Sequence, residues 1–301
     1  MAAGSLYAQQ LPHYTQYLIN DFPMNPAIAG TKMSFIGRSN HRYQWAGITD
    51  SPRTYIFSLN GPLKNPKIGV GATLFTDITG PTRRTGLQLA YAYHVKLSET
   101  MNLSFGLSGG LLQFTVDGSK ITTKEPGDIA FSNGLMTSLV PDGGAGVYLY
   151  GDHYFLSLSA PQIIQYKLRF FDDYPETMGR LVNHYFIFGG YTFDISEDIA
   201  IEPSAMIKYV QPAPVQIEPT VRFIYQKLFW AGASYRTAVS PFEADAIGIM
   251  LGYVYQSNLM FGYSYDITMS NLKNYSSGTH ELMIGIRFKS HSDNTNKASI
   301  E

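Results

Sequence analysis

From about residue 32 onward, apolar side chains recur at every second position, and clusters of turn-forming residues separate the alternating segments. A period of two is typical of β-strands, whereas amphipathic helices repeat every 3.6 residues. The clearest segment is 86–97, where Leu, Tyr and Val alternate with Gly, Gln, Ala, His and Lys. The pattern therefore predicts an all-β chain whose strands have one apolar face and one face of small or polar residues.

About fourteen alternating segments can be counted, and an even number of strands is typical of bacterial outer-membrane barrels. The segments are centred near Phe35, Ile56, Val70, Leu89, Leu107, Val147, Leu156, Ile187, Ala205, Val221, Ala233, Leu251, Tyr263 and Ile284. Brief connections at 98–101, 150–153, 195–198, 226–228 and 256–258 alternate with long ones at 117–142, 161–181, 236–245 and 270–279. Short periplasmic turns and long external loops are expected of such a barrel, if the chain starts in the periplasm.

The polarity of the two faces favours a membrane barrel over a soluble one. Charged residues make up 15% of the chain, against about 25% in soluble domains, and aromatic residues make up 14%. A membrane barrel turns its apolar face to lipid and keeps polar groups in the lumen. We therefore predict a transmembrane, antiparallel, up-and-down β-barrel over residues 32–288, in the cell outer membrane. The alternative is ordinary packing of the aromatic rings in a soluble sheet.

Alternation also assigns charged side chains of both signs to the lumen. They are Arg38, Arg42, His94, Lys96, Glu202, Lys208, Glu218, Arg222, Arg236, Asp266, Glu281 and Arg287. Because buried charges need partners or water, we expect Glu202 and Glu218 to pair with Lys208 or Arg222 and to brace the lumen or a plug. The alternative is a set of separate, solvated charges.

Two prolines interrupt this part of the predicted wall. Pro203 and Pro219 each follow one of the two glutamates inside a strand, where proline removes a ladder donor. A paired bulge that bends the wall is the expected consequence.

The two ends of the chain lie outside the alternating region. Residues 1–10, with Ala8 before Gln9 and Gln10, resemble the remnant of an export signal; a disordered soluble terminus is the alternative. Residues 11–31 contain three prolines, and we expect an extended segment that lies in or against the periplasmic mouth and partly plugs it; a plain periplasmic tail is the alternative. Residues 289–301 form a polar C-terminal tail.

Motifs that would carry chemistry are missing from the sequence. The chain has no Cys, and its seven His residues form no recognisable arrangement with Ser and Asp. It contains no G-x-S-x-G, H-E-x-x-H, P-loop or dinucleotide motif. The formal net charge of -1 provides no basic field for nucleic acid. We therefore predict no catalytic, cofactor or metal site, no nucleic-acid partner, and a protein that is not an enzyme.

A series of short motifs resembles the PorP/SprF family of type IX secretion and gliding-motility proteins. They are the run 9–17 (QQLPHYTQY), 24–30 (MNPAIAG), 42–45 (RYQW), 51–54 (SPRT), 69–72 (GVGA), 141–146 (PDGGAG), 156–159 (LSLS) and 275–282 (YSSGTHEL). The resemblance implies an outer-membrane accessory protein that binds either the C-terminal domain of a secreted adhesin or the trans-envelope motor complex.

Loop 161–181 is the candidate for such protein–protein interaction. It carries Tyr166, Phe170, Phe171 and Tyr174 among charged residues, a mixture typical of protein interfaces. The alternative is packing of this loop over the barrel mouth. Two other functions remain open at this point. A small-molecule transporter would need an open lumen or a gap in the wall near Pro203 and Pro219, and a membrane enzyme would need a Ser or Asp beside a His at the rim.

Overall fold

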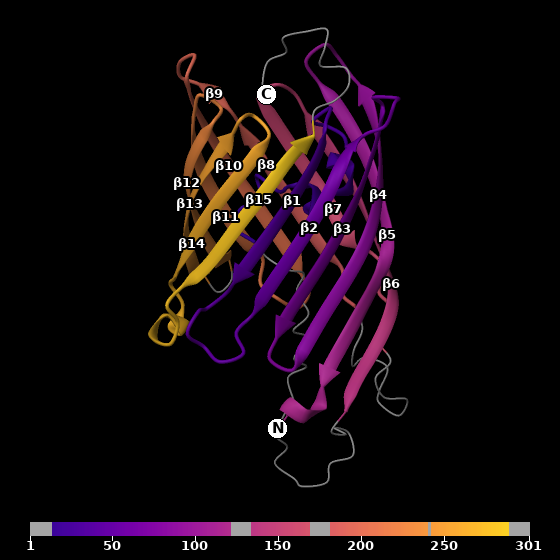
Figure 1. The fold of residues 1–301 in the computed structure, drawn as a ribbon, viewed down its shortest axis with the longest axis vertical. Helices are drawn as coiled ribbons and strands as arrows, with labels where there is room; N and C mark the ends of the chain where they lie inside the picture. The colour runs from indigo at the N-terminus through magenta and orange to yellow at the C-terminus, as the bar shows by residue number, and fades with distance from the viewer. Residues whose placement is uncertain (1–13, 122–133, 169–180, 240–241, 289–301) are drawn as a thin grey trace.

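A closed antiparallel β-barrel forms the body of the computed structural model, which describes residues 14–121, 134–168, 181–239 and 242–288 (Figure 1). Its strands are β1 (Phe35–Tyr43), β2 (Arg53–Pro62), β3 (Ile68–Thr79), β4 (Thr82–Lys96), β5 (Asn102–Asp117), β6 (Leu135–Tyr150), β7 (Tyr154–Gln162), β8 (His184–Tyr191), β9 (Phe193–Asp194), β10 (Ile199–Val210), β11 (Gln216–Tyr225), β12 (Phe229–Val239), β13 (Phe242–Tyr255), β14 (Leu259–Thr268) and β15 (Thr279–Phe288). The two-residue β9 pairs with β10 in the register of β8, so the wall has fourteen strands.

Pairing between the first and last strands closes the wall. β1 and β15 are antiparallel from Phe35 opposite Phe288 to Tyr43 opposite His280. Every other pair joins strands that follow one another along the chain, with β9 inserted between β8 and β10. Closure leaves no edge strand with unpaired N–H and C=O groups, which is a requirement within a bilayer.

The predicted fold class is confirmed, and each of the fourteen predicted strand centres lies in a wall strand of its own. Some strands run further than predicted. β6 already begins at Leu135, and β12 and β13 extend to Val239 and from Phe242. The loops expected at 117–142 and 236–245 are therefore shorter, because their outer parts continue the hairpin ladder.

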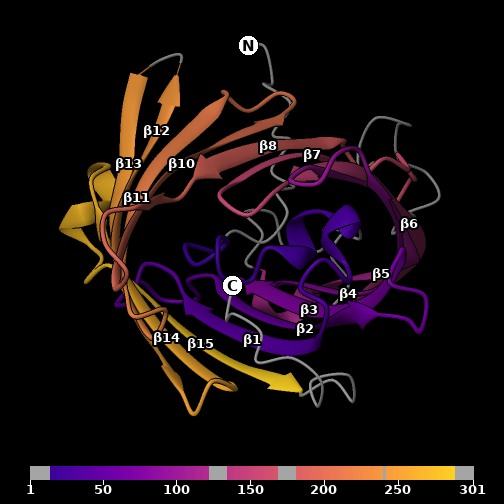
Figure 2. The ribbon, with the colours of Figure 1, turned by 90° about the horizontal axis from the view of Figure 1, so that it is seen from above.

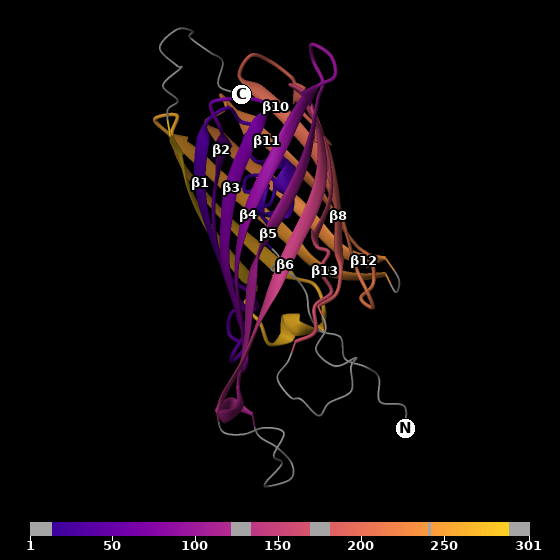
Figure 3. The same ribbon diagram turned by 90° about the vertical axis from the view of Figure 1, so that its right-hand side faces the viewer.

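The two ends of the barrel differ in their connections. Connections 63–67, 97–101, 151–153, 195–198, 226–228 and 256–258 lie at one end, which we call the short-turn end. Connections 118–134, 163–183 and 269–278 lie at the other, the long-loop end, together with the short 3-10 helices η3 (Gly118–Lys120) and η4 (Asn271–Asn274). The hairpin of β5 and β6 projects furthest there (Figure 3). Short turns mark the periplasmic side of a bacterial barrel.

Side chains alternate across the wall in the sense expected for a membrane barrel. Outward-facing Leu89 and Leu107 are 62% and 65% exposed, whereas inward-facing Ser104 is fully buried. Large apolar residues therefore meet the bilayer, and small or polar ones face the lumen. Within the described ranges, no helix is long and apolar enough to cross a membrane.

Pro203 and Pro219 interrupt the ladder without shifting its register, so the paired bulge predicted there is wrong. β10 and β11 pair continuously through Pro203 opposite Val221 and Ala205 opposite Pro219. Pro203 lies at the interruption between β8 and β9, and the pairing of β11 with β12 skips Pro219. Each proline thus faces a local break on the side where its missing N–H would have donated. Register shifts occur instead after Arg236 in β12 and after Ser159 in β7.

Candidate functional site

The lumen is occupied by the chain's own N-terminal segment, residues 14–34, which we call the plug. Figure 2 looks down the barrel and shows this segment, in indigo, inside the ring of strands. Its first described residues lie deep in the barrel: Tyr14, Gln16 and Tyr17 are at most 1% exposed. From there the chain runs to the short-turn end, where β1 begins at Phe35.

The described part of the plug is coiled rather than extended. It contains the 3-10 helices η1 (Phe22–Met24) and η2 (Pro26–Ile28), each with a proline in its first two positions. Proline suits that place because its backbone angle is already helical and the missing N–H would have no partner there. Asn25 begins η2: its Oδ1 accepts a hydrogen bond from the N–H of Ala27 at 2.9 Å. The prolines that argued against regular structure thus start two tight turns.

Asn25 also ties the plug to the wall. Its Nδ2 donates to Ser157 Oγ at 2.8 Å and to the carbonyl of Val147 at 3.0 Å. Ser159 Oγ donates to the carbonyl of Met24 at 2.7 Å, and Ser104 Oγ to that of Ala27 at 2.6 Å. Wall serines facing the lumen therefore take up the carbonyl groups that short helices leave unpaired.

Glycines let η2 press against the backbone of β5 and β6. A side chain at Gly106 would overlap the backbone of Ala27, and one at Gly146 would overlap the side chain of Asn25. Both positions face the lumen, where alternation predicts a side chain. Glycine at these two positions therefore brings the plug into direct contact with the wall.

One side of the plug completes a hydrophobic core inside the lumen. Tyr17 contacts Phe188 edge to face, with ring centroids 5.9 Å apart. The residues of this core come from the plug, the wall and the 163–183 connection; they are Tyr14, Tyr17, Phe22, Met24, Ala27, Ile28, Ala29, Ile56, Phe75, Ala92, Leu112, Val140, Tyr148, Leu168, Leu181, Phe186, Phe188 and Met206. Full burial of one large apolar side chain contributes about 1.5–3 kcal/mol, so this contact is a main source of plug stability.

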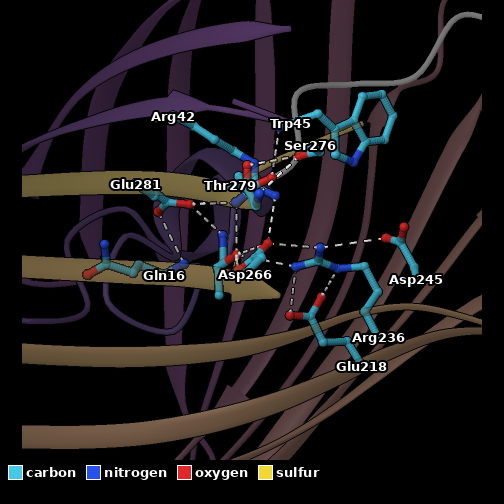
Figure 4. Close-up of polar contacts among 12 residues, drawn as sticks. Gln16, Arg42, Trp45, Glu218, Arg236, Asp245, Asp266, Ser276, Thr279 and Glu281 are labelled. Carbon is cyan, nitrogen blue, oxygen red and sulfur yellow. Dashed lines mark hydrogen bonds and ion pairs between the residues drawn. The ribbon is translucent and has the colours of Figure 1, made fainter. Parts of the chain in front are cut away.

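The other side of the plug meets a buried ionic network on β1, β11, β12, β14 and β15 (Figure 4). Arg42 Nη2 lies 2.8 Å from Asp266 Oδ2, and Arg42 Nη1 lies 3.2 Å from Glu281 Oε2. Arg236 Nη1 lies 3.1 Å from Asp266 Oδ2, and Arg236 Nε lies 3.0 Å from Glu218 Oε2. None of these five side chains is more than 4% exposed, so each charge depends on its neighbours for compensation.

This network holds the N-terminal part of the plug. The N–H groups of Thr15 and Gln16 donate to the carboxylate of Glu281 at 2.7 and 3.2 Å. Thr15 Oγ1 donates to Asp266 Oδ1 at 2.8 Å and accepts from Arg42 Nη1 at 2.9 Å. Hydrogen bonds to ionised groups are about twice as strong as neutral ones. Arg236 Nη2 donates to the same Oγ1 at 3.2 Å, so one threonine and its following amide join the plug to two carboxylates and two guanidinium groups.

A second set of polar contacts holds the middle of the plug. Asn20 Nδ2 donates to Asn40 Oδ1 at 2.8 Å, and Ser58 Oγ donates to Asn20 Oδ1 at 2.8 Å. Asn40 Nδ2 donates in turn to Glu281 Oε1 at 2.9 Å, which joins this set to the ionic network. Asp21 lies 3.5 Å from Arg38. Contacts on β1 and β2 therefore continue the attachment from the network toward the short-turn end.

The structure places the predicted lumen charges in two groups. Arg222 Nη2 lies 2.8 Å from Glu202 Oε1, in a pair that bridges β10 and β11. Glu218 lies with Arg236 in the ionic network. Lys208 is half-buried on β10, opposite Gln216. A polar recess of about 140 Å³ remains beside the Glu202–Arg222 pair at the short-turn end.

Of the predicted interface residues, Tyr166 is described and is 40% exposed at the long-loop end. Phe170, Phe171 and Tyr174 lie outside the described residues. The residues on either side, Leu168 and Leu181, are buried in the core that the plug completes. In the described part of the chain, no group of three or more His, Asp or Glu side chains could hold a metal ion.

Sequence reasoning missed the plug residues that make these contacts. Thr15, Gln16 and Asn25 lie in the runs 9–17 and 24–30 that carry the family resemblance, and Asn20 lies between these runs, but neither run predicts a contact for an individual side chain. Alternation did assign Arg42, Arg236, Asp266 and Glu281 to the lumen, where all four are buried. It could not predict which of them meet.

Comparison with solved structures supports the fold. A Pseudomonas aeruginosa FadL homologue aligns with a TM-score of 0.51 at 11% identity, covering 88% of this chain and 93% of its own. The CymD monoaromatic hydrocarbon channel aligns with a TM-score of 0.54 at 13% identity, covering 90% and 93%. At such identities the likeness concerns the barrel fold alone. No curated protein sequence matches the chain.

The family is shown by a sequence model that spans nearly the whole chain. The model of the type IX secretion system membrane protein PorP/SprF matches residues 6–286, which include the plug and all but the last residues of β15. An outer-membrane location follows from the family and from the apolar outer face of the barrel. The chain belongs to the PorP/SprF family of type IX secretion system membrane proteins.

Proposed function

We propose that this protein is a non-enzymatic accessory barrel of the type IX secretion and gliding machinery, which docks protein partners on its surface and does not pass solutes. Its partner is either the C-terminal domain of a secreted adhesin or the trans-envelope motor complex. The observation that carries the proposal is the filled lumen: the plug is held by a hydrophobic core on one side and an ionic network on the other.

The small-molecule channel is the rival function. A wall of fourteen strands falls between eight-stranded barrels, which side chains fill, and porins of sixteen or more strands, which conduct. In this barrel the folded plug fills the part of the lumen that the side chains of fourteen strands would leave open. The strands around Pro203 and Pro219 keep their register and provide no offset for a gap in the wall. These observations favour docking over transport.

Exposed apolar residues at the long-loop end support a docking surface there. Leu135, Phe242 and Tyr275 are 72%, 70% and 75% exposed, and Tyr166 adds a fourth side chain at the same end. Aromatic residues are enriched in protein–protein interfaces, so exposed rings at this end are available to a protein partner. Because this end carries the long loops, it is the external side of an outer-membrane barrel, where secreted proteins arrive.

An affinity pull-down from gently solubilised outer membranes, followed by mass spectrometry, tests the proposal. We expect one large adhesin or motor components with the wild type. A variant with Tyr166→Ser and a Gly/Ser linker in place of 169–180 should lose an adhesin bound at the external side, while Leu168 and Leu181 stay to preserve the core. The matched control replaces 122–133, a segment of equal length at the same end, by the same linker.

Three outcomes would count against the proposal. Recovery of the barrel alone from wild-type membranes would remove the docking role. Stable conductance of the wild type in planar bilayers would support the channel. Equal loss of the partner in both linker variants would show that the 163–183 connection has no specific part in docking.

A further inference from the structure

The outer wall of the barrel contains a second concave surface, on the side of β4–β8. This groove has a volume of about 720 Å³, within the range of about 300–1,000 Å³ that is usual for small-molecule sites. Its lining is almost entirely apolar, and no charged residue belongs to it. The residues that line it are Tyr91, Tyr93, Phe105, Gly106, Leu107, Ala145, Gly146, Val147, Leu158, Ser159, Ala160, Tyr185, Phe186 and Ile187.

The groove arises because small residues lie between large ones on the lipid-facing side. Ala145 on β6 and Ala160 on β7 lie opposite each other in the ladder, next to the bare backbone of Gly146. The walls are built by outward-facing rings and branched chains on the neighbouring strands, such as Phe105 and Tyr185, which are 49% and 44% exposed. The ladder between β7 and β8 is irregular between Ser159 and Gln162, directly beside this floor.

The plug supports the groove from within. Gly106 and Gly146 contribute to the groove on the outer face, and on the inner face the same two glycines receive the backbone of η2 and the side chain of Asn25. The strands between plug and groove are thus backed by a buried core and cannot move inward to close the depression. A binding surface held open in this way avoids the ordering cost that a flexible one must meet on binding.

We infer that this groove is a binding site for an acyl chain of an outer-membrane phospholipid. The groove opens into hydrocarbon, because the residues around it face the bilayer, and an apolar concavity there is filled by hydrocarbon and not by water. Phe105 and Leu107 lie in the half of β5 nearer the short-turn end, whereas Tyr185 lies at the start of β8 at the long-loop end, so the groove runs along the lipid-facing wall as an acyl chain does. The lack of charged lining residues means that the chain, and not the headgroup, is recognised.

A lipid site on this wall is independent of the protein that the barrel docks. It requires only the outer-membrane location and the shape of the wall. A specific acyl site differs from ordinary annular lipid in that its occupant stays bound when the bulk lipid is removed. That difference makes the site measurable.

Native mass spectrometry of the purified protein tests the site. The wild type is exchanged into a mild detergent with a limiting amount of phosphatidylethanolamine, and we expect one lipid to remain bound. Ala145→Trp, which fills the floor, should lower the bound fraction about tenfold, the effect of losing contacts to about two methylene groups. The matched control is Ala233→Trp, at an exposed outward position on β12, outside the groove.

The following outcomes of the lipid-retention measurement would contradict the proposed site. A wild type that keeps no phosphatidylethanolamine, or equal retention by the two Trp variants, would overturn the site. Ala160→Phe provides a second filling of the same floor, and heat-modifiable migration on gels checks that each barrel is folded. A protein fragment bound in the groove in place of lipid would also overturn the inference.

Discussion

Replacing Asp266 by Asn removes the charge that Arg42 and Arg236 share. Asp266 Oδ2 lies 2.8 Å from Arg42 Nη2 and 3.1 Å from Arg236 Nη1, and its Oδ1 accepts from Thr15 Oγ1. The amide of Asn has the same shape as the carboxylate, so the substitution leaves no cavity. It removes one negative charge. The guanidinium groups of Arg42 and Arg236, which are 2% and 4% exposed, then face either the amide oxygen of Asn, a weaker acceptor, or its NH2 group, a further donor.

The expected cost follows from the burial of the network. Breaking a buried ion pair by removing one partner costs about 3–5 kcal/mol, because the other charge stays buried without compensation. Arg42 keeps Glu281 and Arg236 keeps Glu218, at 3.2 and 3.0 Å. The loss should therefore fall near the lower limit, about 3 kcal/mol in the free energy of unfolding. The plug should also loosen, since Thr15 Oγ1 exchanges an ionised acceptor for at most a neutral amide oxygen.

Urea unfolding in detergent micelles, followed by tryptophan fluorescence, measures this cost. Trp230 is a suitable reporter because it is 7% exposed in a second lumen cluster. The control is Asp194→Asn, which breaks a pair with His153 whose side chains are 59% and 48% exposed and should cost no more than about 1 kcal/mol. A loss below about 1 kcal/mol for Asp266→Asn would refute the assignment of the network as the main polar anchor.

Further predictions concern the plug itself. Deleting residues 14–31 should turn a silent protein into an ion-conducting one in planar bilayers, because fourteen strands enclose more space than their own side chains fill; a deletion barrel that folds but stays silent would contradict this. A disulfide between Thr15→Cys and Gly248→Cys should form once the hydroxyl of Ser234, 2.6 Å from a Cβ at Gly248, turns aside, since that Cβ would lie 3.0 Å from Thr15 Cγ2 and the chain has no other Cys. The oxidised form should protect the plug from protease more than the reduced form does, and equal cleavage would count against the packed plug. Gly146→Val should expel Asn25 from its site and raise conductance, whereas Ala233→Val on the lipid-facing wall should leave a silent barrel.

The barrel wall could be predicted because its signal is local. Whether a residue faces lipid or lumen depends on its parity within a strand, and parity can be counted from neighbours alone. Leu107 and Ser104 illustrate the result, since one is 65% exposed and the other is fully buried. Strand ends were less predictable: β6 starts at Leu135, seven positions before the end of the loop expected at 117–142, because residues of that loop continue the ladder with β5.

The bulge predicted at the two prolines was wrong because the prediction considered only the strand that contains each proline. Pro203 and Pro219 were expected to bend the wall through a bulge, yet the register passes through both positions. Each proline lacks an N–H group, and the strand beside it is itself interrupted. For Pro203 the interruption is at Thr192, between β8 and β9, and for Pro219 it is the stretch of β12 that does not pair with β11. Whether a proline shifts a register or only skips a bond depends on the strand opposite, and the sequence does not contain that information in any local form.

The sequence by itself determined the number of wall strands, their order, the direction in which each side chain points and the presence of charges in the lumen. All of these follow from periodicity and from the difference between water and hydrocarbon as solvents. Only the tertiary structure decided how the lumen is filled. Glu281 meets the amide of Thr15 across 266 positions of sequence. Such a contact exists only once β1 and β15 have paired and the ring has closed, so its partners are selected by the shape of the closed barrel and not by any spacing along the chain.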